Sequence, residues 1–125
     1  MDTIRTFRDL NVWKKSIEMV KGIYLLTKRF PNEEVYGLTS QMRRAAISIP
    51  SNIAEGKSRR SKSEYVQFLY VALGSAAELE TQTIIARELK YINEEQADNF
   101  LENLNHVARM LQSLITKLQK HNPNR

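Results

Sequence analysis

Residues 41–56 have the sequence QMRRAAISIPSNIAEG, and this stretch decides the fold. A proline inside a helix removes one backbone hydrogen bond and clashes with the preceding turn, at a cost of about 3 kcal/mol. The helical spacing nevertheless continues on both sides of Pro50, with an apolar series (Leu38, Met42, Ala45, Ile49, Ile53) beside a polar one (Gln41, Arg44, Ser48, Asn52, Glu55). The stretch therefore predicts a helix over residues 39–56 that is kinked at Pro50 without ending there.

Three more amphipathic patterns predict helices over residues 9–29, 61–90 and 93–120. Ser61 with Glu64, and Asn93 with Gln96, have the spacing of a capping box, in which side chains satisfy the free amides of a helix start. Gly56 is expected to end the second helix in a left-handed cap. The first helix has two apolar stripes, one of Leu10, Trp13, Ile17, Val20 and Tyr24 and one of Val12, Met19, Ile23, Leu26 and Phe30.

The third and fourth helices have apolar residues in a repeating 4-3 spacing, which is typical of helices that pack about 20° from antiparallel. Short polar connections join the helices, and four glycines and three prolines leave little room for a turn-rich β fold. We expect an all-α fold, an antiparallel up-down-up-down four-helix bundle, with residues 1–125 as a single domain. The second stripe of the first helix and the extra residues Phe100, Val107, Met110 and Leu114 indicate self-association, unless wide stripes serve two neighbours within one bundle.

The composition excludes several classes of site. The chain has no cysteine, which rules out disulfides, thiolate nucleophiles and cysteine-ligated metals and fits a reducing, cytoplasmic compartment. No apolar stretch is long enough to span a membrane, and the first residues lack the core of a signal peptide. His106 and His121 are too far apart along the helix to share a metal. We expect no catalytic residue, cofactor, metal or small-molecule substrate, and therefore no enzyme; a glycosidase pair of Glu55 and Glu78 would lack anything to position a sugar.

The net charge of +5 is unevenly distributed along the chain. Residues 1–62 hold 13 basic and 6 acidic residues, whereas residues 63–125 hold 6 basic and 8 acidic residues. One end or side of the bundle is therefore expected to be electropositive, which favours binding to phosphates or acidic partners.

The strongest basic cluster lies in the connection between the second and third helices. Lys57, Arg59, Arg60 and Lys62 surround the expected start of the third helix, where free amides and the helix dipole favour anions. With Arg43 as an expected neighbour, these residues form the candidate nucleic-acid contact. The alternative is a solvated loop.

The polar stripe of the second helix is a second candidate site. Arg44, Ser48, Asn52 and Glu55 are expected to face the third helix, where Ser75, Glu78 and Gln82 have matching spacing and Glu78 suits a pair with Arg44. We expect either a structural hydrogen-bonded network or a subunit interface.

The same motifs resemble a known family in their order and spacing. They are Phe7 to Trp13, Phe30-Pro31, Tyr36 to Gln41, Arg43 to Ala45, Ser48 to Gly56, and Phe68-Leu69 through Gly74-Ser75 to Glu78-Leu79-Glu80. The chain resembles the four-helix-bundle family of ribosomal intervening-sequence proteins, whose members are encoded in inserts within large-subunit ribosomal RNA genes and elsewhere in bacterial genomes. Related proteins, such as the accessory variability protein of diversity-generating retroelements, form pentameric barrels that engage a reverse transcriptase and nucleic acid.

The resemblance implies a bacterial homo-oligomer, with the pentamer as its expected size. Together with the basic loop, it leads to the hypothesis of a non-enzymatic protein that binds RNA or a ribonucleoprotein partner through a basic face. The alternative is a protein-interaction adaptor or scaffold without direct nucleic-acid contact. The two differ in whether the basic residues converge on one exposed surface or are scattered and paired with acids.

Overall fold

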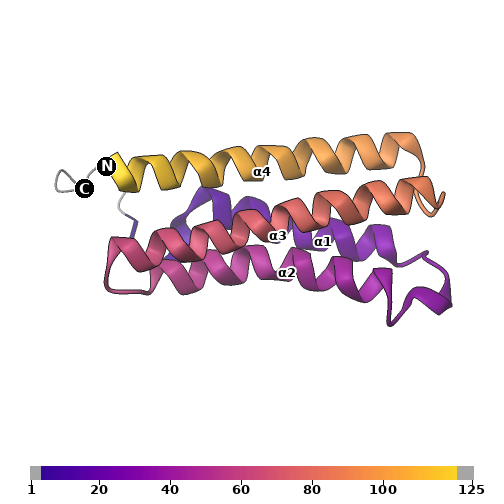
Figure 1. The fold of residues 1–125 in the computed structure, drawn as a ribbon, viewed down its shortest axis with the longest axis horizontal. Coiled ribbons are helices and arrows are strands. Elements are labelled where there is room, and N and C mark those ends of the chain that lie inside the picture. Colours follow the sequence, from indigo (N-terminus) through magenta and orange to yellow (C-terminus); the bar gives the residue numbers. More distant parts are fainter. Residues whose placement is uncertain (1–3, 121–125) are drawn as a thin grey trace.

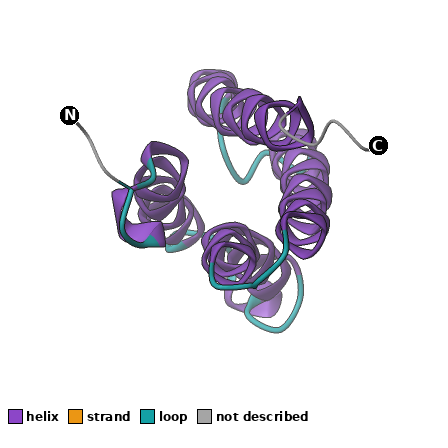
Figure 2. Cartoon of the chain, turned by 90° about the vertical axis from the view of Figure 1, so that its left-hand side faces the viewer, coloured by secondary structure: helices purple, strands orange, loops and turns teal. Residues whose placement is uncertain are grey.

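A computed structural model describes residues 4–120 as four sequential helices that run up and down. They are α1 (Asn11–Thr27), α2 (Leu38–Lys57), α3 (Lys62–Glu88) and α4 (Glu94–Lys120), preceded and interrupted by short 3-10 turns at Phe7–Asp9 and Asn32–Glu34. Figure 1 shows the antiparallel arrangement, and the end-on view of Figure 2 shows the helices around a common interior. The predicted all-α bundle is confirmed. Within residues 4–120, no helix combines the length and hydropathy that a bilayer span requires.

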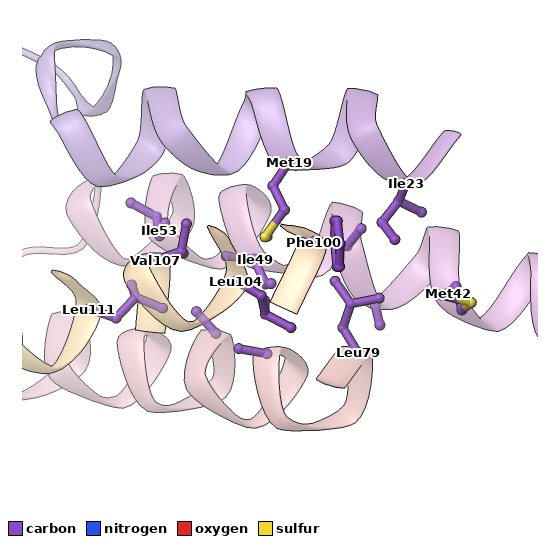
Figure 3. Close-up of a cluster of buried hydrophobic side chains, with 14 of the residues drawn as sticks. Met19, Ile23, Met42, Ile49, Ile53, Leu79, Phe100, Leu104, Val107 and Leu111 are labelled. Carbon is purple, nitrogen blue, oxygen red and sulfur yellow. The ribbon is translucent and has the colours of Figure 1, made fainter. Parts of the chain in front are cut away.

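The interior is made by the apolar faces that the helical spacing defines. Figure 3 shows Ile49 and Ile53 of α2 and Leu104, Val107 and Leu111 of α4 directed into the same cluster, which α1 closes with Met19 and Ile23. Phe100 and Val107 belong to this core. The wide apolar surface of α4 therefore serves neighbours within one bundle, and does not supply the unpaired surface that we expected of it.

Helix α2 stays continuous through Pro50, as predicted, and the kink remains a prediction. Its buried face includes Met42, Ile49 and Ile53, none of which exposes any measurable surface. Burying a side chain of this size stabilises a fold by about 1.5–3 kcal/mol, so three of them outweigh the roughly 3 kcal/mol that an internal proline costs. Tertiary packing, rather than helix propensity, holds α2 together.

The predicted starts of α3 and α4 are confirmed by their caps. The Ser61 hydroxyl accepts the Glu64 amide at 3.1 Å, and Asn93 and Gln96 exchange two backbone-to-side-chain hydrogen bonds of 2.9 and 2.8 Å. The Ser61 hydroxyl also donates to the Glu64 carboxylate, so of these two predicted boxes the one of Asn93 and Gln96 is reciprocal.

The expected left-handed cap at Gly56 is wrong. Gly56 lies inside α2 with a negative φ, and it is buried. A Cβ at this position would stand 2.8 Å from the Phe68 Cβ and 3.1 Å from the Tyr65 carbonyl oxygen. The glycine therefore lets α2 and α3 approach closely. Within residues 4–120, the residue in the left-handed conformation is Lys90 (φ 65°). It follows the end of α3, where the Lys90 amide donates to the Arg87 carbonyl and the Tyr91 amide donates to the Ala86 carbonyl.

The Glu34 side chain links the α1–α2 connection by hydrogen bonds to the start of α2 and to the segment that follows α3. Its carboxylate accepts the Leu38 amide at the start of α2 at 3.0 Å and the Tyr91 hydroxyl at 2.8 Å. The Leu38 bond, followed by the Tyr91 bond, lowers the pKa of Glu34, because both favour the ionised carboxylate.

Replacing Glu34 with glutamine is therefore expected to lower the melting temperature at pH 7. The pKa of Glu34 is lowered in the folded protein, so its stabilisation is complete above the ordinary carboxyl pKa and disappears as the pH falls through the lowered value. Melting curves between pH 3 and pH 7 should show the two proteins converging in acid. Glu33→Gln is the matched control. A gap that stays constant over this pH range would contradict the prediction.

Candidate nucleic-acid interface

The short α2–α3 connection carries the predicted basic cluster to one end of the bundle (Figure 1). The close approach at Gly56 places the first turns of α3 directly beside the last turn of α2. Two aromatic side chains of α3, Tyr65 and Phe68, consequently lie next to the basic residues.

Two of the four basic side chains are positioned by these rings. The Arg59 guanidinium lies 4.8 Å from the Phe68 ring centroid and donates to the Glu55 carboxylate at 2.9 Å, and the Lys57 ammonium lies 5.8 Å from the Tyr65 ring centroid. Each contact is worth only about 0–1 kcal/mol at such exposure. They orient the charges without removing them from solvent, since 41% of the Arg59 side chain is exposed. Burial by the neighbouring helices raises the pKa of Tyr65 to about 12, so its hydroxyl stays neutral.

Arg60 and Lys62 complete the cluster and are exposed. Within residues 4–120, Arg60 forms no ion pair. Two more lysines, Lys117 and Lys120, lie at the same end of the bundle, because α4 ends there (Figure 1). Helix α1 also begins at this end. The acidic start of α4 (Glu94, Glu95) lies at the opposite end of the bundle.

Arg43 does not join this cluster. Its guanidinium donates to the Thr27 hydroxyl at 2.9 Å and lies 4.3 Å from the Tyr24 ring centroid, so it fastens α2 to α1. Fourteen residues separate it from Lys57, which is about 21 Å along a helix. The expected neighbourhood of Arg43 and the loop is not formed.

The predicted polar stripe divides into two parts. The Asn52 amide donates to the Ser48 carbonyl and hydroxyl oxygens at 2.8 and 2.9 Å, and the Ser48 hydroxyl lies 2.8 Å from that of Ser75 on α3. These residues form the expected link between α2 and α3, whereas Glu55 turns to Arg59 of the basic loop.

The expected pair of Arg44 with Glu78 is not formed. No ion pair joins the two side chains, and both are exposed to solvent. Gln82, on the same side of α3 as Ser75, is buried, and its Oε1 has no hydrogen-bond partner in the described part of the chain.

A hollow of about 690 Å³ lies between α1 and the α3–α4 connection and includes Lys28, Arg29 and Tyr91. The Tyr91 hydroxyl donates to Glu34, which raises the pKa of Tyr91. In residues 4–120, no three His, Asp or Glu side chains gather as metal ligands would. His121 lies outside the described residues.

Sequence reasoning missed the outward face of α3. Its side chains Tyr70, Val71, Ile85 and Leu89 are each 43–51% exposed, an unusual number of large apolar residues for one helix surface. The sequence pattern that indicates this face is a second series of residues in 4-3 spacing, beside the series that is buried in the core. Its members are Val71, Gly74, Glu78, Thr81, Ile85 and Glu88.

Comparison with known proteins identifies the family. The model of the 23S rRNA-intervening sequence protein family matches residues 8–113. A solved structure from Bacteroides thetaiotaomicron VPI-5482, described as a protein of unknown function from the S23 ribosomal protein family, is similar in fold, with a TM-score of 0.78 and 27% sequence identity. The similarity covers 83% of this chain and 97% of the other. No curated protein matches this chain.

Proposed function

Because the chain belongs to the 23S rRNA-intervening sequence protein family, we propose that it is a non-catalytic protein that self-associates and binds RNA or a ribonucleoprotein partner. The contact is the α2–α3 loop, with Lys57, Arg59, Arg60 and Lys62 at the basic end of the bundle. The homo-oligomer, with the pentamer as its expected size, would present one such loop for each copy.

The observation that carries the proposal is the convergence of these four cations on the α2–α3 loop and the two helix ends that flank it, beside two aromatic rings. Flexible basic side chains contact phosphates without reading base edges, so the interaction is expected to be weakly selective and strongly dependent on salt. Repetition of the loop in an oligomer would raise the effective concentration and make individually weak contacts useful.

A second candidate, an adaptor that contacts only proteins, is favoured by the engagement of two of the predicted cations. Arg59 pairs with Glu55, and Arg43 is used between α1 and α2. A protein partner with an acidic surface would meet the same loop.

Neutralising Arg59, Arg60 and Lys62 together with glutamine is expected to weaken RNA binding and flatten its salt dependence. Three lost phosphate contacts should reduce the slope of log affinity against log salt by about 2 units for single-stranded RNA. Lys57 is kept because it is the one of the four that is partly buried, over the Tyr65 ring. Fluorescence anisotropy with a labelled oligonucleotide between 50 and 300 mM salt provides the measurement.

The matched control neutralises Arg29, Arg87 and Lys90, away from the loop, and should leave the slope unchanged. An unchanged affinity and slope in the loop variant would remove the loop from the interface. A parent protein that binds neither RNA nor DNA at low salt would favour the adaptor.

A further inference from the structure

Helix α1 carries an apolar stripe that the bundle does not fully cover. Its other stripe, which includes Val12, Met19 and Ile23, fills the core. In the outer stripe Leu10, Trp13, Ile17 and Val20 are only partly buried, and Tyr24 is 40% exposed. Leu25 beside them is 72% exposed. A hollow of about 510 Å³ lies here between Val20, Tyr24, Leu25 and Arg43, with Lys21 and Lys28 at its rim.

A row of cations follows this stripe. Lys14, Lys21 and Lys28 recur every seven residues, so they lie on one side of α1 at intervals of about 10 Å, and all three are exposed. The Lys21 ammonium forms an ion pair of 3.2 Å with the Glu18 carboxylate on the same helix, and both side chains are exposed. The outward face of α1 is therefore apolar with a basic flank.

The outward face of α3 has the complementary character. Val71 and Ile85 are exposed in the same 4-3 series as Glu78 and Glu88. No ion pair within residues 4–120 involves Glu78, and Glu88 contacts only its neighbour Arg87, at 3.4 Å. Gly74 lies midway along this face, and a Cβ there would meet no atom within 4 Å. A second helix could therefore approach the α3 backbone closely.

We propose that the outward face of α1 in one copy packs against the outward face of α3 in a second copy, with the Lys14, Lys21 and Lys28 row beside Glu78 and Glu88. The proposal rests on the proposed self-association and names the two surfaces that produce it. Apolar 4-3 seams flanked by opposite charges are the features by which helices choose their partners in coiled coils.

Helices α1 and α3 lie diagonally across the bundle from each other (Figure 2) and do not contact each other, so their outward faces are directed to opposite sides. A contact from α1 to α3 therefore uses a different surface on each of the two copies. The first copy keeps an unused α3 face, and the second keeps an unused α1 face. Such a head-to-tail contact repeats from copy to copy until the rotation closes a ring. The basic α2–α3 loop lies at the end of the bundle, outside the contact.

Charge reversal tests the pairing without nucleic acid. Lys21→Glu and Glu78→Lys are each expected to weaken self-association by about tenfold, because each replaces an attraction with a repulsion across the contact. A protein that carries both changes in one chain should recover the assembly, because opposite charges then meet at every contact, whatever the number of copies in the ring. Light scattering after size exclusion, at low salt and with circular dichroism as the folding check, gives the mass. Lys15→Glu and Glu80→Lys are matched controls on the same helices, outside the two faces.

Each outcome decides the proposal. Single variants that dissociate toward 14.5 kDa, together with a double variant that assembles, would support it. A parent that is already 14.5 kDa at micromolar concentration would overturn both the pairing and the proposed self-association. A parent that assembles while Lys21→Glu and Glu78→Lys behave like their controls would overturn the pairing alone. Single variants that dissociate and a double variant that stays dissociated would also overturn it.

Discussion

Truncating Ile49 to alanine is expected to lower the free energy of unfolding by about 2–5 kcal/mol. Ile49 is fully buried in the centre of α2, immediately before Pro50 (Figure 3). The change removes buried apolar surface and leaves a cavity among residues of the other helices. It also withdraws packing from the helix that carries the proline, whose missing backbone bond makes α2 dependent on its neighbours.

Ile49→Val is the graded control, with an expected loss of about 0.5–1.5 kcal/mol. Urea unfolding of all three proteins at one protein concentration gives the comparison, because self-association makes apparent stability depend on concentration. A loss below about 1 kcal/mol for the alanine variant would mean that the core does not hold α2 as described.

Replacing Gly56 with alanine is expected to cost about 1–3 kcal/mol, although alanine is the better helix former. The added methyl group would meet the Phe68 Cβ at 2.8 Å and the Tyr65 carbonyl oxygen at 3.1 Å. A backbone carbonyl and a Cβ cannot rotate away, so α2 and α3 would have to separate. The loop cations would move with them.

Gly22→Ala provides the matched control within α1. Its Cβ would lie 4.0 Å from Phe100, an ordinary contact, so the helix propensity of alanine should raise stability by about 0.5–1 kcal/mol. Thermal melts of the two variants should therefore shift in opposite directions. Equal shifts for Gly56 and Gly22 would show that the close approach does not constrain position 56.

Local signals in the sequence were sufficient for the helices. The predicted ranges agree with the observed helices within two residues, because capping side chains and apolar spacing act between residues that are near in sequence. The role of Gly56 could not be read in this way. Its conformation depends on Tyr65 and Phe68 of the next helix, and the left-handed residue is a lysine, a type that rarely adopts that conformation.

The candidate site was only partly predictable for the same reason. The basic loop follows directly from the sequence, because its members are within six residues of one another. Arg43 was misplaced, since adjacent residues on a helix point about 100° apart and only the fold decides which one reaches α1. The outward face of α3 was overlooked because a helix with apolar residues all around shows no single preferred side.

An even number of helices returns the chain to the end from which it started. The start of α1, the α2–α3 connection and the end of α4 all lie at one end of the bundle, and the α1–α2 and α3–α4 connections lie at the other (Figure 1). A fused reporter or affinity handle on either side of residues 4–120 would thus emerge beside the basic cluster and compete with its ligands. The α3–α4 connection at the far end is the better attachment point for a label or surface tether, because it leaves the basic end unobstructed.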